Sequence, residues 1–319
     1  MAYDNESFLA GIAVGRNMES WPAMEGNTIF RFTIHAAAGQ WSTPYMVFSG
    51  MIDWGDGSRQ TSFNNIPIGY NYDYADRGQA NHTYAAEGNY QITLNGKLLD
   101  WSTNKNPNNP GINRTLLSID TPFPRSMKDR KSFSSLVRYS TNLISLPSGL
   151  FRYCEGINNL YGAFWDCRAI ATLPPQLLLG CENVTNIEQL FRRTALIDLP
   201  DDLFIYTPNV ESLSFVFSHI TTMQRFPDGI FAPLTKLREV DGMCWENTGL
   251  VGIQRDLFAN LPVENFAQAF WYCTGIVEDI PPYWTDFPNA DGNGCFEGCR
   301  NAPNYSSIPE VWRLFGIRP

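Results

Sequence analysis

Two acids in one glycine-rich stretch are the first candidates for chemistry in this chain. Asp53 and Asp56 lie on either side of Trp54 and Gly55, and Gly57 follows, in the stretch "IDWGDGS". Two such carboxylates could bind calcium, but Ca²⁺ takes about six to eight oxygen ligands. An Asp-Gly pair is also a strong turn signal, because glycine adopts positive φ and aspartate bonds nearby backbone N–H groups. We therefore predict a structural turn at Asp53, Asp56 and Gly57, and no metal.

The seven cysteines are the next candidates. Cys295 and Cys299 form a C-x3-C pair, but no second Cys or His pair accompanies it, so we do not expect a zinc site. Cys154 and Cys181 lie 27 residues apart and could stack in a repeat. A disulfide between them would require a suitable Cα separation. An odd number of cysteines does not favour a complete disulfide framework.

Catalytic arrangements are not evident. The three histidines, His35, His82 and His219, occur in no Ser/His/Asp or Cys/His pattern, although His82 or Thr83 is expected close to the Asp56 turn. The chain has no G-x-S-x-G, H-E-x-x-H or P-loop motif. Several acids could form a glycosidase pair, but acids on turns are more often solvated. These acids are Asp198, Asp201, Asp202, Glu278 and Asp279. We expect no enzyme and no cofactor, and a glycan-active enzyme is the third alternative.

Composition excludes several classes of partner. The chain has 319 residues, 44% of them apolar, and a net charge of −9. Its one basic cluster is the short "MKDRK" at 127–131, so neither nucleic acid nor an anionic membrane is expected as a partner. The N-terminal apolar run follows acids rather than a basic leader, and no stretch approaches about 18 apolar residues. We expect a soluble protein without a secretory signal and without membrane insertion.

Residues 1–25 are predicted to form an N-terminal docking segment. Ser7 can cap a helix through "FLAGIAVGRNM", in which glycines four residues apart leave one face bare. The residues proposed to dock are Phe8, Gly11, Val14 and Gly15. A frayed terminus is the alternative.

Residues 26–98 have the pattern of β-strands. "TIFRFTIHA" alternates apolar and polar residues, "YMVFSGMIDW" ends at the turn, and "HTYAAEGNYQITLNG" contains a second turn and strand. Short strands separated by turn residues favour a small β-sandwich. The Asn/Pro-rich stretch "STNKNPNNPGINRT" then predicts a linker at 99–115.

Two motifs in this region resemble a known family. "IDWGDGS" followed by "HTYAAEGNYQITL" is similar to the signature of PKD domains, which have an immunoglobulin-like fold. The Trp-Gly-Asp-Gly form is common in phage-encoded copies. The resemblance covers about a quarter of the chain and implies an all-β sandwich.

An internal repeat dominates residues 116–319. Apolar–proline pairs recur every 26 to 28 residues, with Ile253-Gln254 filling one gap. Their first residues are Leu146, Leu173, Leu199, Phe226, Ile253, Ile280 and Ile308. We call the residues at one position of successive repeats a column. A second column holds Phe164, Phe191, Phe217, Cys244, Phe270 and Phe296. A fixed period with apolar columns predicts a solenoid of stacked coils, each of which buries its inner face against its neighbours.

The repeat also resembles a family. "FWDCRAIATLP", "FRRTALIDLP" and "FWYCTGIVEDIP" are similar to the repeat unit of BspA-type leucine-rich-repeat-like proteins, which occur on bacterial surfaces and in bacteriophages. Cys244, Gln254 and Ile220 depart from the pattern in ways that packing can tolerate. The resemblance implies an α/β leucine-rich-repeat-like solenoid of about 27-residue coils and a role as an interaction surface. The overall expectation is a multidomain chain, consisting of docking helix, sandwich and solenoid.

The combined features favour a bacteriophage virion protein (fibre, tail or capsid decoration) that attaches to the host surface. Its N-terminal segment would contact other virion proteins, its solenoid would bind a host glycan or protein, and a homo-oligomer is possible. We expect it in the virion, made in the host cytoplasm. A bacterial surface or secreted adhesin is the alternative.

The column after the phenylalanines varies in chemistry, from indole to guanidinium to carboxylate. It contains Trp165, Arg192, Ser218, Trp245, Trp271 and Glu297. Such variation indicates an outward position, and tryptophan is enriched at binding hot spots. We therefore predict an exposed platform of Trp165, Trp245 and Trp271 with Tyr272 beside it. The alternative is that the indoles cover coil edges.

Overall fold

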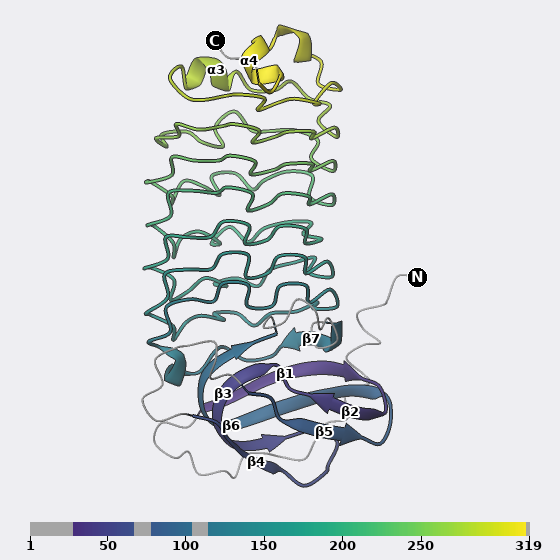
Figure 1. Cartoon of the computed structure of the whole chain (residues 1–319). Coiled ribbons are helices and arrows are strands. Elements are labelled where there is room, and N and C mark those ends of the chain that lie inside the picture. The colour runs from purple at the N-terminus through teal and green to yellow at the C-terminus, as the bar shows by residue number, and fades with distance from the viewer. Residues whose placement is uncertain (1–27, 67–77, 104–113, 317–319) are drawn as a thin grey trace.

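The computed structural model describes residues 28–66, 78–103 and 114–316 (Figure 1). The predicted docking segment, with Phe8, Gly11, Val14 and Gly15, lies outside the described residues. Regular secondary structure consists mainly of strands, with few helical residues. Figure 1 shows a β region near the N-terminal end, from which a stack of irregular coils extends to a small helical cap. We call residues 28–66, 78–103 and 114–119 the β region and residues 120–316 the coil stack.

Two sheets form the β region. Its strands are β1 (Thr28–Ala36), β2 (Gly39–Ser42), β3 (Tyr45–Asp53), β4 (Thr61–Asn64), β5 (Asn81–Tyr84), β6 (Gly88–Ser102) and β7 (Leu116–Ile119). Five strands form one sheet in the order β4-β3-β6-β1-β7, and β2 pairs with β5 in the other. All of these pairs are antiparallel. Alternate residues of β1 (Phe30, Phe32 and Ile34) are fully buried, as expected for strands with one face on a core.

Strand β6 is longer than the sequence suggested. The predicted boundary at residue 98 and the start of the 99–115 linker both fall inside it, because it continues to Ser102 along β3. Trp101 is fully buried there, and the buried carboxylate of Asp100 pairs with Arg130. A buried indole and a satisfied buried charge keep these residues in the strand despite the polar stretch that follows.

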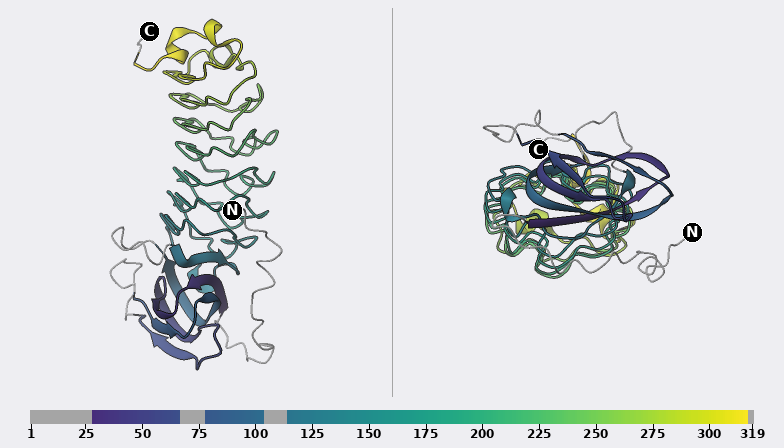
Figure 2. Two further views of the ribbon diagram at one scale, coloured as in Figure 1. Left: turned by 90° about the vertical axis from the view of Figure 1, so that its right-hand side faces the viewer. Right: turned by 90° about the horizontal axis from the view of Figure 1, so that it is seen from below.

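Strand β7 joins the two regions. On one side it pairs with β1. On the other side its backbone bonds to the first turns of the stack. Ile119 N–H donates to the Ser145 carbonyl at 3.1 Å, and Ile144 N–H donates to the Leu117 carbonyl at 2.8 Å. The aromatic core is also continuous, since the Phe30 and Phe123 rings stack at 5.1 Å. The coils therefore extend the sheet and its core, and Figure 2 shows them stacked along one axis above the β region.

Seven coils make up the regular part of the stack. We number them by the residue at their central position, which is Val137, Phe164, Phe191, Phe217, Cys244, Phe270 and Phe296 for coils 1 to 7. All seven of these side chains are fully buried. The rings of Phe164 and Phe191 stack at 5.7 Å, and those of Phe191 and Phe217 at 6.0 Å. The central residues of coils 2, 3 and 4 therefore pack on one another, as do those of coils 6 and 7.

The backbone around the central column alternates between two kinds of hydrogen bond. In coil 2, the N–H groups of Leu160, Gly162, Phe164 and Asp166 donate to carbonyls of coil 3 at 2.8–3.0 Å. The N–H groups of Ala163, Trp165 and Cys167 donate three residues back within their own coil, at 3.0–3.2 Å. Every second amide thus holds the stack together while the others close consecutive turns, and the buried donors are satisfied without a strand or a helix.

This turn pattern is produced by residues with positive φ. The positions two before and two after the central residue have positive φ in all seven coils. Those before are Ser135, Gly162, Gln189, Phe215, Gly242, Gln268 and Gly294; those after are Tyr139, Asp166, Arg193, His219, Glu246, Tyr272 and Gly298. A non-glycine residue in this conformation costs about 1 kcal/mol, which the bonds between coils offset.

The expected α/β character of the solenoid is therefore wrong. Within the stack, which is described without gaps from 120 to 316, the helices are short turns: η2 (Arg125–Met127), α3 (Tyr283–Asp286), η3 (Tyr305–Ser307) and α4 (Glu310–Arg313). The reason is the left-handed residues that interrupt each coil twice, since a helix requires negative φ throughout. At the C-terminal end Trp312 packs on Phe266 and Phe296 and covers the last coil.

A further column consists of small polar residues whose side chains accept a bond from the N–H two residues on. These are Ser132, Asn159, Asn186, Ser212, Asn265 and Asp291, with acceptor distances of 2.8–3.2 Å. Glu239 occupies the same position in coil 5. Short Asn, Asp and Ser side chains form such turns readily, so this column fixes where each coil begins.

Candidate functional site

Trp245, Trp271 and Tyr272 form one aromatic cluster on the side of coils 5 and 6. The Trp245 and Trp271 rings are 4.3 Å apart at 49°, and the Trp271 and Tyr272 rings are 4.1 Å apart at 48°. Both indoles are half-buried, whereas Tyr272 is 41% exposed. The bonds from Glu246 N–H to Trp271 O (2.7 Å) and from Tyr272 N–H to Glu297 O (2.6 Å) hold the backbones side by side.

The cluster combines the two arrangements considered for these indoles. Trp245 packs at 5.8 Å from Phe215, and its Nε1 donates to Glu246 Oε1 at 3.1 Å, so it partly covers a coil edge. The Trp271 Nε1 is buried without a hydrogen-bond partner among the described residues. Trp271 has a ring neighbour in both Trp245 and Tyr272, and Tyr272 is the most exposed of the three side chains. An apolar surface of this kind suits a flat ligand such as a sugar face.

Trp165 lies apart from this cluster, in coil 2. The Cζ of Arg138 lies 3.4 Å from its ring centroid, and the Cζ of Arg192 lies 5.0 Å from it. The four predicted platform residues therefore divide into a cluster of three and a separate indole held between two guanidinium groups. Sequence reasoning placed Trp165 and Arg192 in one column but did not foresee that they stack on each other.

The Asp53–Gly57 segment forms a turn at the end of β3. Asp53 accepts a bond from Gly55 N–H at 3.0 Å, and Asp56 accepts one from Ser58 N–H at 2.9 Å. Gly55 and Gly57 both have positive φ. A Cβ on Gly55 would lie 2.5 Å from a carbonyl of β6, so only glycine fits there.

His82 closes this turn from β5. Its Nε2 lies 2.7 Å from Asp56 Oδ2, and its ring stacks on Trp54 at 4.7 Å. Burial raises the pKa of Asp56, but the bonds from Ser58 and His82 outweigh it and hold the pKa below its ordinary value. Both carboxylates are thus occupied by protein donors, and among the described residues no group of three or more His, Cys, Asp or Glu side chains could hold a metal ion.

The cysteines are all free and buried. Sγ of Cys167, Cys273 and Cys299 donates to a carbonyl of the preceding coil at 3.0–3.2 Å. Burial raises the pKa of the Cys154 thiol to about 12. Cys154 and Cys181 are not joined. These thiols pack the core and are not reactive at neutral pH.

Sequence reasoning missed a group of acids in the stack, around Asp241. Burial, followed by repulsion from Glu239, Asp291 and Glu188, raises the pKa of Asp241 to about 6. Glu188 lies in coil 3, Glu239 and Asp241 in coil 5, and Asp291 in coil 7. Once the period is known, the sequence carries this signal, because Glu188 and Asp241, like Glu239 and Asp291, occupy equivalent positions about two repeats apart.

The acids first considered for catalysis are dispersed. Glu278 pairs with Arg225, Asp202 accepts from the Gln176 N–H, and Asp198 accepts from the Leu199 N–H. Their partners lie in different turns, and each bond connects two groups of the stack itself. No helix within the described ranges has the length and hydrophobicity needed to cross a membrane.

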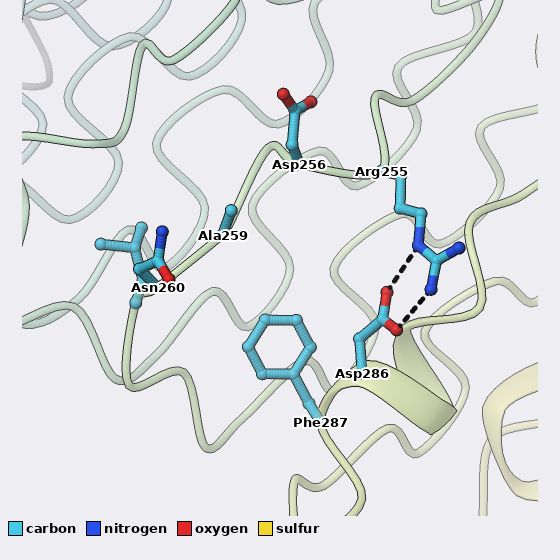
Figure 3. Close-up of a pocket in the computed structure, with 7 residues that line it drawn as sticks. Arg255, Asp256, Ala259, Asn260, Asp286 and Phe287 are labelled. Carbon is cyan, nitrogen blue, oxygen red and sulfur yellow. Dashed lines mark hydrogen bonds and ion pairs between the residues drawn. The ribbon is translucent and has the colours of Figure 1, made fainter.

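A hollow of about 580 Å³ opens between residues 255–261 and α3. Figure 3 shows the lining residues, among them the Arg255 guanidinium joined to the Asp286 carboxylate and the Phe287 ring beside that ion pair. The two bonds of this ion pair are 2.9 and 3.2 Å long. None of the residues predicted to bind or catalyse lines this hollow.

Comparisons with known proteins yield little. No protein-family model matches the chain, and no curated protein matches it. Among solved structures, the leucine-rich repeat domain of the type III effector XopL matches with 13% sequence identity and a TM-score of 0.26, covering 62% of this chain and 74% of that chain. A TM-score this low carries no argument about fold or function.

Proposed function

We propose that this chain is a non-enzymatic structural and binding protein that attaches through its coil stack to a glycan or protein on a bacterial cell surface. The observation that carries the proposal is the cluster of Trp245, Trp271 and Tyr272 at the surface of coils 5 and 6. Most other large aromatic side chains of the stack are buried between coils. Aromatic surface left at the outside of a stable stack is typical of a binding site.

The join between the two regions supports a display role. A shared aromatic core and the bonds around β7 make the stack an extension of the β region. A rigid spacer presents a binding surface with less loss of conformational entropy than a flexible one. In this proposal the PKD-like β region is the base, and the leucine-rich-repeat-like solenoid is the part that reaches the partner.

The setting that we propose is a bacteriophage virion, in a fibre, a tail or a capsid decoration. The support for it is the resemblance of both regions to phage-encoded domains, together with the N-terminal segment as the part that contacts other virion proteins. The test is mass spectrometry of purified particles from cells that carry the gene. The protein is expected in the particles; its recovery in the envelope or the medium and its absence from particles would establish the adhesin alternative.

Attachment is tested with labelled full-length protein on candidate host cells. Tyr272→Ala removes exposed ring surface from the cluster, so it is expected to lower cell binding about ten-fold, as hot-spot residues do. Tyr206→Ala, which removes a half-buried tyrosine outside the cluster, is the matched control. Equal binding by the two variants, with unchanged melting temperatures, would place the attachment surface elsewhere.

A further inference from the structure

The coils next to the β region carry a patch of arginines around Trp165. We call Arg138, Arg168, Arg192 and Arg193 the arginine patch; they belong to coils 1 to 3. Arg138 and Arg192 stack on the Trp165 ring. The backbone bond from Asp166 N–H to Arg192 O, 2.8 Å long, ties coil 2 to coil 3 at this point. The patch is therefore built on the rigid part of the stack.

Two arginines of the patch share one carboxylate. Asp166 is shared, with Arg168 at 2.8 Å and Arg193 at 3.9 Å. The one hydrogen bond of the Arg192 side chain is to the neutral amide of Gln189, at 3.3 Å, and its Nε is without a partner among the described residues. Among the described residues no carboxylate forms an ion pair with Arg192, although the more distant Glu246 favours its charge. A half-buried guanidinium without a direct carboxylate partner is costly, and an anionic ligand would lower that cost.

Three arginines elsewhere in the stack each pair with one carboxylate. Arg225 pairs with Glu278, Arg238 with Glu264 and Arg255 with Asp286. The positive charge also acts on the pKa of Arg192 and on that of the neighbouring His219 in coil 4. Burial, followed by the charge of Arg193, lowers the pKa of Arg192. Burial lowers the pKa of His219; Glu246 opposes this effect, and Arg192 and Arg193 add to it. The patch thus brings several positive charges together in a chain whose net charge is −9.

We propose that Arg192 and Arg193 bind an anionic group, a phosphate or a carboxylate, of an acidic surface polysaccharide whose sugar rings contact the aromatic cluster. This inference rests on the proposed function and specifies the class of its ligand. Coil 3 and coil 5 are two coil spacings apart, or about 10 Å at the spacing of hydrogen-bonded chains. A polymer that lies along the stack can therefore reach both sites. Guanidinium groups bind phosphate and carboxylate with paired hydrogen bonds.

The surroundings favour a glycan over a nucleic acid. Glu246 and Glu297 flank the aromatic cluster in coils 5 and 7, and Asp241 lies in coil 5. A nucleic acid carries a phosphate at every residue, so these acids would repel it along the stack. A polysaccharide with spaced anionic groups can place one at the arginines and neutral rings at the tryptophans.

The first experiment titrates the full-length protein with three polymers and follows tryptophan fluorescence. The probes are poly(glycerol phosphate), an oligogalacturonate as the carboxylate source, and neutral dextran. One anionic polymer is expected to bind at least about ten-fold more tightly than dextran, with affinity that falls as salt rises. The tighter of the two identifies the anion. Binding of dextran as tight as that of both anionic polymers would overturn the inference.

The second experiment uses variants. Arg193→Gln removes a charge whose side chain is 47% exposed, and Arg238→Gln removes one that is 52% exposed outside the patch. Arg193→Gln is expected to weaken anionic binding about ten-fold at an unchanged melting temperature, the loss of one charge-assisted contact. Equal affinities for the two variants would overturn the inference. Arg192→Gln gives a second reading, in which a loss confined to anionic polymers supports the assignment.

The two proposals fail separately. If cells bind through Tyr272 but neither anionic polymer binds more tightly than dextran, the ligand class is wrong and attachment stands. If an anionic polymer binds through Arg193 but cells are not bound, the attachment function is wrong and the anion site stands.

Discussion

The β region and the coil stack satisfy their backbones in two different ways. In the β region, long antiparallel strands pair over distant parts of the sequence, as β1 does with β6. In the stack, alternate amides bond within a coil and to the next coil, about one repeat away. A sheet with a shared core unfolds as a unit, whereas the stability of each coil in a solenoid depends on its nearest neighbours. We therefore expect the same kind of core substitution to have different effects on unfolding in the two regions.

The largest expected effect comes from the central column. Phe191→Ala leaves a cavity between coils 2 and 4 and is expected to cost about 3–5 kcal/mol of unfolding free energy, as is Phe32→Ala in β1. Denaturant unfolding measures the cost, and hydrogen exchange locates it. Loss of protection should stay within coils near Phe191 but spread across the sheet for Phe32→Ala.

A surface change in the same part of the stack is the control. Glu182→Ala, at an exposed side chain, is expected to change stability by less than about 0.5 kcal/mol. Equal spread of exchange in the two phenylalanine variants would break the comparison, because the stack would then unfold as one body with the β region.

The next effect concerns the turn at the end of β3. Asp56→Ala removes bonds from Ser58 and His82 and is expected to cost about 1–2 kcal/mol at neutral pH. Because the pKa of Asp56 is lowered in the folded protein, its contribution exists above the ordinary pKa and disappears as pH falls through the folded value. Thermal melts from pH 7 to pH 3 measure this. Calcium should leave the melting temperature of the wild type unchanged; a rise that Asp56→Ala abolishes would contradict the turn assignment.

Ionisation of Asp241 in the stack is predicted to have the opposite effect on stability from that of Asp56. Its pKa is raised to about 6, so its ionisation costs stability as pH rises above the ordinary value, and the full cost is present above about pH 6. Asp241→Asn should therefore stabilise the protein at pH 7.5 by about 1 kcal/mol, after allowance for screening at a half-exposed group. At pH 4 the variant and the wild type should melt alike. A variant less stable at pH 7.5 would show that the carboxylate has a stabilising partner.

The smallest effect tests the column that begins each coil. Glu239→Asn supplies the short acceptor that the other six coils have at this position. It also removes a carboxylate near Asp241. The expected gain is about 0.5–1 kcal/mol. Asn186→Ala, which removes this acceptor in coil 3, should lower the stability by a similar amount. Opposite signs in the two denaturation curves support the role of the column, and equal signs contradict it.

The sequence predicted periodic features better than local backbone. The period near 27 and the central column at Phe164, Phe191 and Phe217 follow from packing, since only large apolar residues repeat at a buried position. The turns were not predictable in the same way, because residues as different as Gln189, Phe215 and Glu246 have positive φ there. Bonds between coils impose that conformation, and propensity does not indicate it. The end of β6 was missed for a similar reason, since burial of Trp101 outweighs the polar residues after it.

The candidate site was predictable in part. A variable column pointed to Trp245, Trp271 and Tyr272, which lie together. It could not separate Trp165 from them, since the partner of each indole depends on stacking between coils. Arg192 was expected to face outward with the rest of its column, but it is half-buried against Trp165.

The attachment claim is tested most directly by the indole N–H signals of the uniformly ¹⁵N-labelled protein. Trp→Phe variants assign the signals, and soluble oligosaccharides released from host envelopes are the ligand. The signals of Trp245 and Trp271 are predicted to shift on titration, whereas those of Trp54 and Trp101, buried in the β region, should not move. Shifts confined to the β region, or none in the cluster at saturating ligand, would contradict the account.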